Sequence, residues 1–329
     1  MIDGRHFALG LLAAVCVGCG GGAPPAEAPP PEPPAPAVPT AEAPPAEDPK
    51  PVEPEAPPAP KPVVTWKDGL STPESVLVDG DRYLVSNIDG KPLDVDGNGF
   101  ISELAPDGKV LRAKFIAGGE NKVKLDAPKG MGIVKGILYV ADITRVRKFD
   151  AKSGAPKGEI AIKGATFLND IAVAEDGRIF VSDTGMKAGE KDFEPTGTDA
   201  IYVIDKAGRV KAYAKGEALT RPNGLLATAD GVLVAPFGSN EVSRFDAKGE
   251  RQDATALPKG GLDGIVAVGD SLLVSSWQGS AVYRGKLGGT FEPVLWNVKA
   301  PADIAYDSKL GRVLVPRFMD NAVEAYEIK

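Results

Sequence analysis

The stretch RPNGLLATADGVLVAPF, residues 221–237, decides how this chain folds. It contains an apolar run, a turn at ADG and a second apolar run, which is the pattern of two short strands joined by a tight turn. Related stretches begin with TPES (72–75), FLND (167–170) and GLDG (261–264). One position of this recurring unit therefore carries only oxygen-bearing side chains, which are Glu74, Asn169, Asn223 and Asp263.

Two further units begin at APKGMGIVKGILYVAD and APADIAYDSKLGRVLVPRF, which makes six. Most units continue through a polar turn into a third strand and a D-x-x-G turn. Residues 63–329 accommodate six units of about 44 residues, the size of a four-stranded propeller blade. We therefore predict an all-β, six-bladed β-propeller. The last unit ends after three strands, so we expect the strand-like segment 62–69 to supply its outer strand and close the ring.

The chain before residue 63 has a different character. Residues 1–18 resemble a bacterial lipoprotein signal peptide, because a short charged start and a short apolar run lead to CVGC, with Cys19 as the expected lipidated residue. An ordinary secretory signal is the alternative. Residues 19–62 hold 18 of the 30 prolines, so we predict a disordered, extended linker with a reach on the order of 130 Å. We expect no transmembrane helix elsewhere.

Composition excludes several kinds of chemistry. The linker carries −5 of the formal net charge of −7, so the predicted propeller is nearly neutral and nothing indicates a nucleic-acid partner. The only histidine, His6, and both cysteines, Cys16 and Cys19, precede residue 20. Disulfides, cysteine nucleophiles, histidine bases and Cys/His zinc sites are therefore excluded from the propeller. Any metal there must be bound by oxygen atoms.

The recurring position lies just before the innermost strand of each predicted blade, at one mouth of the central channel. The same position holds Lys129 or Gly130 in blade 2, and Ala302 beside Asp303 in blade 6. Alone, each polar residue could be a turn residue that bonds its own backbone. Together they predict a cation site, because two carboxylates crowded in a channel repel each other unless a cation or proton lies between them.

These motifs resemble the senescence marker protein/gluconolactonase/luciferin-regenerating enzyme group of six-bladed propellers over nearly all of residues 66–329. The resemblance implies that Glu74, Asn223 and Asp263 bind one divalent cation directly, and that Asn169 is an outer or water-mediated ligand. It also implies that Asp263 is the general base of lactone hydrolysis. Ca²⁺ is the favoured ion, with Mg²⁺, Mn²⁺ or Zn²⁺ through oxygen ligands as alternatives.

Phe167 departs from this family pattern. Sugar-lactonase members have an arginine at the corresponding position, and an apolar ring there argues against a polyhydroxylated lactone. Phe237, Trp277, Arg317 and Phe318 end second strands of blades 4 to 6, where they line a pocket mouth or pack between blades. The charged insertion 183–199 is either a lid over the site or a solvated loop.

The segment DVDGNGFISEL (94–104) begins like a calcium-binding EF-hand loop, with Asp94, Asp96 and Asn98 at the right spacing. The twelfth position is Ala105, where such a loop needs a glutamate. A long hairpin connection with Asn-Gly turn chemistry is the favoured interpretation, and a second Ca²⁺ site is the alternative.

Taken together, the sequence predicts a metal-dependent lactone or ester hydrolase. It would be a monomer, lipid-anchored in the bacterial cell envelope, on the outer membrane facing the periplasm. Its partners would be a small-molecule lactone or ester and, through the lipid alone, a membrane. The alternative is a non-catalytic propeller that binds a ligand or protein and holds a structural metal.

Overall fold

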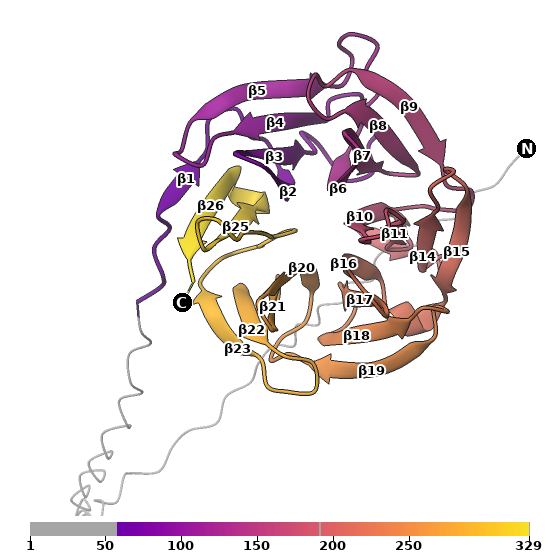
Figure 1. Cartoon of the computed structure of the whole chain (residues 1–329), viewed down its shortest axis with the longest axis vertical. Coiled ribbons are helices and arrows are strands. Elements are labelled where there is room, and N and C mark those ends of the chain that lie inside the picture. Colours follow the sequence, from indigo (N-terminus) through magenta and orange to yellow (C-terminus); the bar gives the residue numbers. More distant parts are fainter. Residues whose placement is uncertain (1–57, 191, 329) are drawn as a thin grey trace, which may run out of the picture. The chain divides into compact units, whose positions relative to one another are not determined.

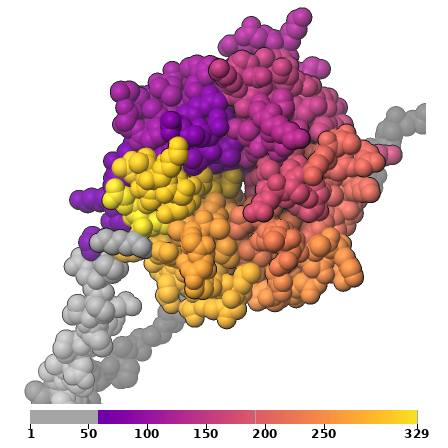
Figure 2. All heavy atoms as spheres, in the orientation of Figure 1, coloured from indigo at the N-terminus to yellow at the C-terminus, as the bar shows by residue number. Residues whose placement is uncertain are grey.

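Six four-stranded antiparallel sheets stand around a common centre in a computed structural model that describes residues 58–190 and 192–328 (Figure 1). The predicted signal peptide, Cys19 and most of the linker lie outside the described residues. The sheets follow one another around the ring in chain order, as the colours of Figure 2 show. The predicted six-bladed, four-stranded architecture is confirmed.

Blades 1 to 3 each run from an inner to an outer strand. Blade 1 contains β2 (Pro73–Asp79), β3 (Arg82–Asn87), β4 (Phe100–Leu104) and β5 (Val110–Ala117). Blade 2 contains β6 (Pro128–Val134), β7 (Ile137–Asp142), β8 (Arg145–Asp150) and β9 (Pro156–Ala161). Blade 3 contains β10 (Leu168–Val173), β11 (Ile179–Asp183), β14 (Ala200–Ile204) and β15 (Val210–Lys215).

Blades 4 to 6 repeat this order, and the sixth takes its outer strand from the beginning of the described chain. Blade 4 contains β16 (Pro222–Thr228), β17 (Gly231–Pro236), β18 (Glu241–Asp246) and β19 (Arg251–Ala256). Blade 5 contains β20 (Leu262–Val268), β21 (Ser271–Ser276), β22 (Ala281–Gly285) and β23 (Glu292–Trp296). Blade 6 contains β24 (Ala305–Asp307), β25 (Arg312–Arg317), β26 (Ala322–Glu327) and β1 (Val64–Trp66).

In the sixth sheet, β1 pairs antiparallel with β26, with Val64 opposite Ala325 and Trp66 opposite Val323. Strands from the two ends of the propeller thus share one sheet, and they lie side by side in Figure 1. The described residues contain no helix long and apolar enough to cross a membrane. Their helical structure consists of two short 3₁₀ turns, Glu217–Leu219 and Phe318–Asp320.

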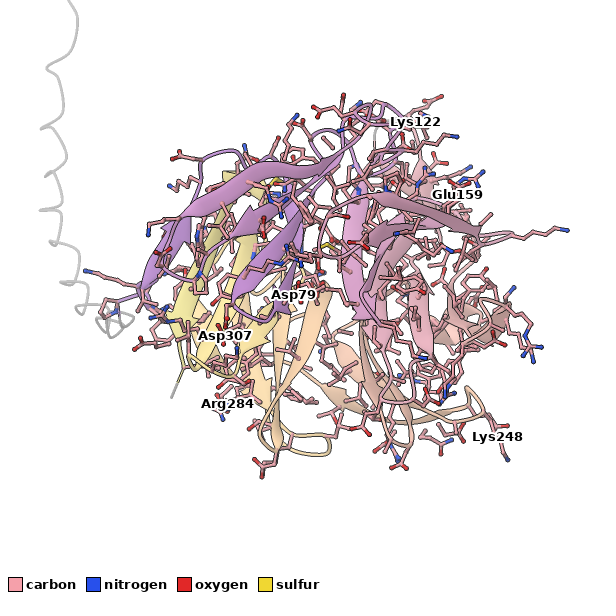
Figure 3. The ribbon with its side chains drawn as sticks, turned by 45° about the horizontal axis from the view of Figure 1, so that its top comes forward. Asp79, Lys122, Glu159, Lys248, Arg284 and Asp307 are labelled. Atoms are coloured by element: carbon pink, nitrogen blue, oxygen red, sulfur yellow. The ribbon has the colours of Figure 1, made fainter. Side chains whose placement is uncertain are left out.

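The hydrophobic cores lie between adjacent blades. Leu84 and Ile101 of blade 1, for example, pack in one cluster with Leu138 and Val140 of blade 2. Second strands are therefore apolar on both faces, and all six residues of β17 are buried. Outer strands such as β19 are largely exposed. Charged side chains such as Glu159 and Lys248 project from the periphery (Figure 3).

The insertion 183–199 contains a separate two-stranded hairpin, β12 (Met186–Ala188) and β13 (Phe193–Pro195). Phe193 reaches back to the blade, where its ring meets Phe167 edge to face at 5.9 Å between centroids. The hairpin thus contacts the residue that lies two positions before Asn169.

Candidate functional site

The recurring polar position is the second residue of the inner strand in five blades. It holds Glu74 in β2, Lys129 in β6, Asn169 in β10, Asn223 in β16 and Asp263 in β20. In all five strands the pairing with the second strand shifts register at this point. A bulge removes a residue from the regular ladder and redirects its side chain, a device common beside functional sites. We call these five residues the inner ring.

In blades 1 to 3, the loop before the inner-ring residue is held by the last residue of that blade's second strand. Asp183 Oδ1 accepts the backbone N–H of Phe167 at 2.8 Å, and Asp142 Oδ1 accepts that of Ala127 at 2.8 Å. Asn87 Oδ1 accepts the N–H of Ser71 at 3.0 Å in the same way. These bonds fix the strand entrances, so the inner-ring side chains start from a rigid frame.

Three inner-ring side chains each keep one buried oxygen without a hydrogen-bond partner. These atoms are Glu74 Oε2, Asn169 Oδ1 and Asp263 Oδ1. The residues are only 6%, 6% and 3% exposed. Buried polar atoms are nearly always bonded, and an orphan in a native fold calls for an explanation such as an ion. Three orphans at one register position of three blades form a set of acceptors.

In Asn169 and Asp263 the other terminal atom is bonded, which fixes the orientation of the side chain. Asn169 Nδ2 donates to Thr184 Oγ1 at 3.0 Å, and that hydroxyl donates to the carbonyl of Pro222 at 2.8 Å. Trp277 Nε1 donates to Asp263 Oδ2 at 2.7 Å. These bonds leave Asn169 Oδ1 and Asp263 Oδ1 as free acceptors. Asn223 is 4% exposed and belongs to the same ring.

Burial controls the protonation of the two inner-ring carboxylates. Burial raises the pKa of Asp263 to about 7, although the hydrogen bond from Trp277 opposes the shift. Burial, together with the charge of Asp263, raises the pKa of Glu74 well above its usual range. Without a cation, charge at this ring is therefore unfavourable near neutral pH.

We predict that the cation-free protein loses stability as the pH rises from about 4 to above 7. A carboxyl group whose pKa is raised by folding stabilises the fold fully below its unfolded pKa of about 4. That contribution is lost as the pH passes the folded value, about 7 for Asp263. Melting temperatures between pH 4 and 8.5 in a chelator will show the decrease, and millimolar Ca²⁺ should reverse it. A flat profile in chelator would contradict the prediction.

The donor set suits a hard divalent cation. Two carboxylates supply two negative charges, and the amide oxygen of Asn169 supplies a neutral ligand. The described residues contain no group of three or more His, Cys, Asp or Glu side chains placed to hold a metal. A site here must therefore combine Glu74 and Asp263 with amides, and its unpartnered oxygens fit such an ion.

Lys129 brings a positive charge to the inner ring. The residue is 1% exposed, and its ammonium donates to the carbonyls of Pro92 and Ala127 at 2.9 and 2.8 Å. It also lies 4.8 Å from the centre of the Phe167 ring. Burial lowers the pKa of Lys129 to about 8, while the charge of Glu74 opposes the shift. The ammonium therefore offsets part of the negative charge of the ring.

We expect Lys129→Met to bind a divalent cation at least about tenfold more tightly, which corresponds to ~1.4 kcal/mol, because it removes a positive charge that repels the ion. Calorimetric titration with Ca²⁺ will measure the change. The matched control is Lys124→Met, since Lys124 is exposed on the preceding loop. Unchanged or weaker binding by Lys129→Met would show that the ammonium does not act on the ion.

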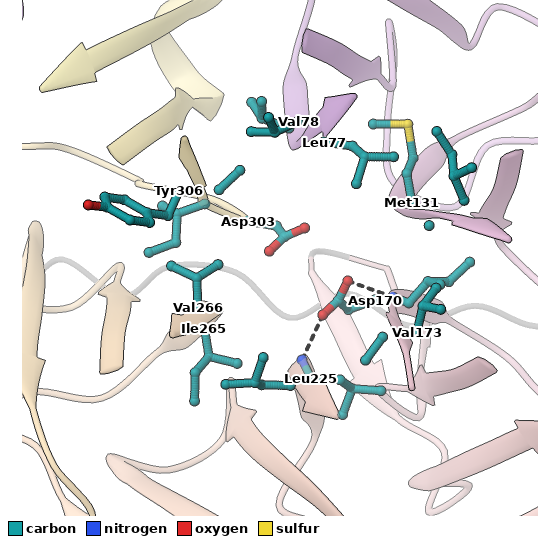
Figure 4. Close-up of a pocket in the computed structure, with 18 of the residues that line it drawn as sticks. Leu77, Val78, Met131, Asp170, Val173, Leu225, Ile265, Val266, Asp303 and Tyr306 are labelled. Atoms are coloured by element: carbon teal, nitrogen blue, oxygen red, sulfur yellow. Dashed lines mark hydrogen bonds between the residues drawn. The ribbon is translucent and has the colours of Figure 1, made fainter. Parts of the chain in front are cut away.

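A second pair of carboxylates comprises Asp170, which follows Asn169 in β10, and Asp303, which lies two residues before β24. Asp170 and Asp303 point into a cavity of about 450 Å³ formed by the inner strands (Figure 4). Asp170 accepts the backbone N–H groups of Ile171 and Leu225, each at 2.6 Å, and Asp303 accepts the hydroxyl of Ser75 at 2.5 Å. The bonds to Leu225 and Ser75 cross between blades, so both carboxylates join neighbouring inner strands.

The other predicted residues are not members of the inner ring, and of these Trp277 contacts it through its bond to Asp263. Asp94, Asp96 and Asn98 are exposed, and Asp96 Oδ1 accepts the backbone N–H of Asn98 at 3.0 Å, as in a local turn. The guanidinium of Arg317 is engaged by Glu324 at 2.6 Å and also by Asp320. Phe237 and Trp277 are half-buried and lie 5.7 Å apart between ring centroids. The sequence gives no signal for the roles of Lys129, Asp170 or Thr184, although Lys129 shares the register of the polar residues.

Comparisons with known proteins agree with this architecture. No protein-family model matches the chain. Over 224 residues it is 28% identical to the adipocyte plasma membrane-associated protein of Gallus gallus, a match that covers 61% of this chain and 49% of that protein. The match thus spans about half the length of the curated relative.

Solved structures share the fold. A gluconolactonase from Xanthomonas campestris superposes with a TM-score of 0.56 at 18% identity, covering 83% of this chain and 99% of that one. The luciferin-regenerating enzyme gives 0.54 at 16%, covering 78% and 87%. A virginiamycin B lyase from Staphylococcus aureus gives 0.54 at 14%, covering 80% and 97%. The chain is therefore a six-bladed β-propeller of the type found in gluconolactonases and the luciferin-regenerating enzyme.

Proposed function

We propose that this protein is a divalent-cation-dependent hydrolase of a lactone or similar ester. The observation that carries the proposal is the set of three buried, unpartnered oxygens of Glu74, Asn169 and Asp263, presented at one register position of three blades. The gluconolactonase fold supports the same class of reaction. A bound divalent cation would polarise the ester carbonyl and acidify a nearby water molecule.

The side chains of the site supply the base and the positioning groups for this reaction. The Asp263 carboxylate accepts the proton of the attacking water, while Trp277 holds its Oδ2 in place. The water oxygen adds to the carbonyl carbon, the bond from that carbon to the ester oxygen breaks, and the proton passes from Asp263 to the departing oxygen. A lactone thus becomes a hydroxy acid. Thr184 keeps the amide of Asn169 turned with its oxygen toward the ion.

Metal content and activity of the purified protein test this proposal together. Inductively coupled plasma mass spectrometry will count bound divalent ions, and a panel of aliphatic, aromatic and sugar lactones will be assayed before and after chelation. We expect one ion per chain, loss of hydrolysis on chelation and recovery when Ca²⁺ is added. A bound ion without turnover would support the alternative of a ligand-binding propeller with a structural ion. Absence of any ion would refute the cation site.

We also propose that Cys19 carries a lipid that tethers the protein to the cell envelope. The proposal rests on the CVGC sequence at residues 16–19 and the proline-rich segment that follows. We expect the full-length protein, expressed in a Gram-negative host, to incorporate labelled palmitate and to fractionate with outer membranes. Cys19→Ser should lose both properties, whereas Cys16→Ser should keep them. Labelling of the Cys19→Ser protein would place the lipid elsewhere.

A further inference from the structure

A second set of side chains recurs at one position of every blade. It consists of the residue directly after the second strand of each blade, and we call it the collar. Its members in chain order are Ile88, Ile143, Thr184, Phe237, Trp277 and Phe318. Five of the six are apolar, although each belongs to a different blade. This recurrence indicates that the collar is a property of the site and that its polarity bears on what the site accepts.

Contacts between collar residues link the blades. The ring of Trp277 lies 5.7 Å from that of Phe237 and 5.2 Å from that of Phe318, between centroids. Phe318 in turn packs against a buried cluster that contains Ile88 and Ile143. The apolar members therefore form a continuous arc from blade 4 through blades 5 and 6 to blades 1 and 2.

Two collar residues bond the side chains that carry unpartnered oxygens. Trp277 bonds the second oxygen of Asp263, and Thr184 bonds the amide of Asn169. A group that binds Asp263 Oδ1 or Asn169 Oδ1 therefore lies close to Trp277 or Thr184. Ile88, Ile143 and Thr184 are buried, whereas Phe237, Trp277 and Phe318 remain half-exposed and can contact a ligand.

The collar has little capacity left for hydrogen bonding. The Thr184 hydroxyl accepts from Asn169 and donates to Pro222, and the indole N–H of Trp277 is committed to Asp263. Phe167, two residues before Asn169, contacts the ring of Phe193 and the ammonium of Lys129. A sugar lactone would bring several hydroxyl groups to these surfaces and leave them unbonded, at a cost of about 1–3 kcal/mol each. An alkyl or aryl group loses nothing there and gains from burial.

We propose that the collar selects an apolar acyl or alkyl group, so that the ligand is a medium-chain aliphatic or aromatic lactone or ester and not a sugar lactone. That the ligand is a lactone or ester rests on the proposed function. That the ligand is apolar rests on the collar alone. Phe237, Trp277 and Phe318 contact the apolar group, while the inner ring holds the carbonyl end.

Two readouts on the full-length protein test the proposal, with γ-decanolactone and D-glucono-1,5-lactone as probes in the presence of Ca²⁺. We expect kcat/KM for γ-decanolactone to exceed that for the sugar lactone at least about 100-fold. γ-Decanolactone should also change the tryptophan fluorescence, and Trp277→Phe should remove that change. Phe237→Ser and Phe318→Ser should each lower kcat/KM for γ-decanolactone about tenfold. Leu111→Ser, at an exposed apolar residue of β5, should leave it unchanged.

The outcomes separate this inference from the hydrolase proposal. If neither lactone is hydrolysed but γ-decanolactone alone perturbs Trp277 fluorescence, the hydrolase proposal fails and the apolar ligand class stands. Equal or better turnover of the sugar lactone would overturn the inference. So would a fluorescence response to the sugar lactone alone, or to neither probe. Melting temperatures of the serine variants will show whether they fold. If one variant does not fold, the variant at the other position still tests the proposal.

Discussion

Asp263→Asn is expected to abolish divalent-cation binding and lactone hydrolysis while leaving the fold intact. In the native protein, Trp277 Nε1 donates to Asp263 Oδ2 at 2.7 Å. Asparagine has the same shape, and its side-chain oxygen can still accept this hydrogen bond. Its other terminal group is then an NH₂, which can neither bind a cation nor accept a proton. We expect hydrolysis to fall by about 10²–10⁴, the contribution of a general base, with cation binding lost as well.

Calorimetric titration with Ca²⁺ and initial-rate assays will measure both effects. Asp253→Asn is the matched control, because Asp253 is an exposed carboxylate on β19 that pairs with Arg244 at 2.7 Å. It should retain wild-type affinity and rate. The variant at Asp263 should also be more stable above pH 7 in chelator than the native protein, since it lacks the carboxyl group whose buried charge is unfavourable. Full activity in Asp263→Asn would exclude this residue as the base.

Gly224→Ala is expected to cause the largest loss of stability of any single methyl addition near the site. A Cβ atom at this position would lie 1.9 Å from the carbonyl oxygen of Asp263 and 3.0 Å from its carbonyl carbon. Both atoms belong to the backbone of the neighbouring inner strand, so no side-chain rotation can relieve the clash. We expect a loss of about 3 kcal/mol or more in the free energy of unfolding.

Chemical denaturation will measure this loss. Gly289→Ala provides the control, because Gly289 also lacks a left-handed φ and its added Cβ would meet its nearest neighbour, Lys286 O, at 3.3 Å. That variant should stay within about 0.5 kcal/mol of the native protein. If Gly224→Ala unfolds at the same denaturant concentration as the native protein, blades 4 and 5 can separate locally. The inner ring is then less rigid than the structure indicates.

Much of the site follows from glycines that could be seen in the sequence but not interpreted there. Gly130 makes room for the carboxylate of Asp170, since an added Cβ would lie 2.4 Å from Asp170 Oδ1. Gly264 does the same for Asp303, with 2.7 Å to Oδ1. Each glycine and its aspartate come from different blades. Their relation is a distance between neighbouring inner strands, and no pattern along one strand encodes it.

The sequence by itself determined the repeat, the six four-stranded blades and the register of Glu74, Asn169, Asn223 and Asp263. It could do so because alternating strands, tight turns and a recurring polar position are local patterns that repeat at a constant interval. Lys129 was visible in that register, but its buried contacts with Pro92, Ala127 and Phe167 were not.

Tertiary structure alone decided which atoms remain free. The orphaned oxygens of Glu74, Asn169 and Asp263 result from bulges in separate sheets and, for Asn169 and Asp263, from bonds to Thr184 and Trp277. The continuity of the collar likewise depends on Phe237, Trp277 and Phe318 meeting across blade boundaries. These contacts join residues that are distant along the chain, and closure of the ring brings them together. Packing between blades, and not local propensity, therefore sets the chemistry of the site.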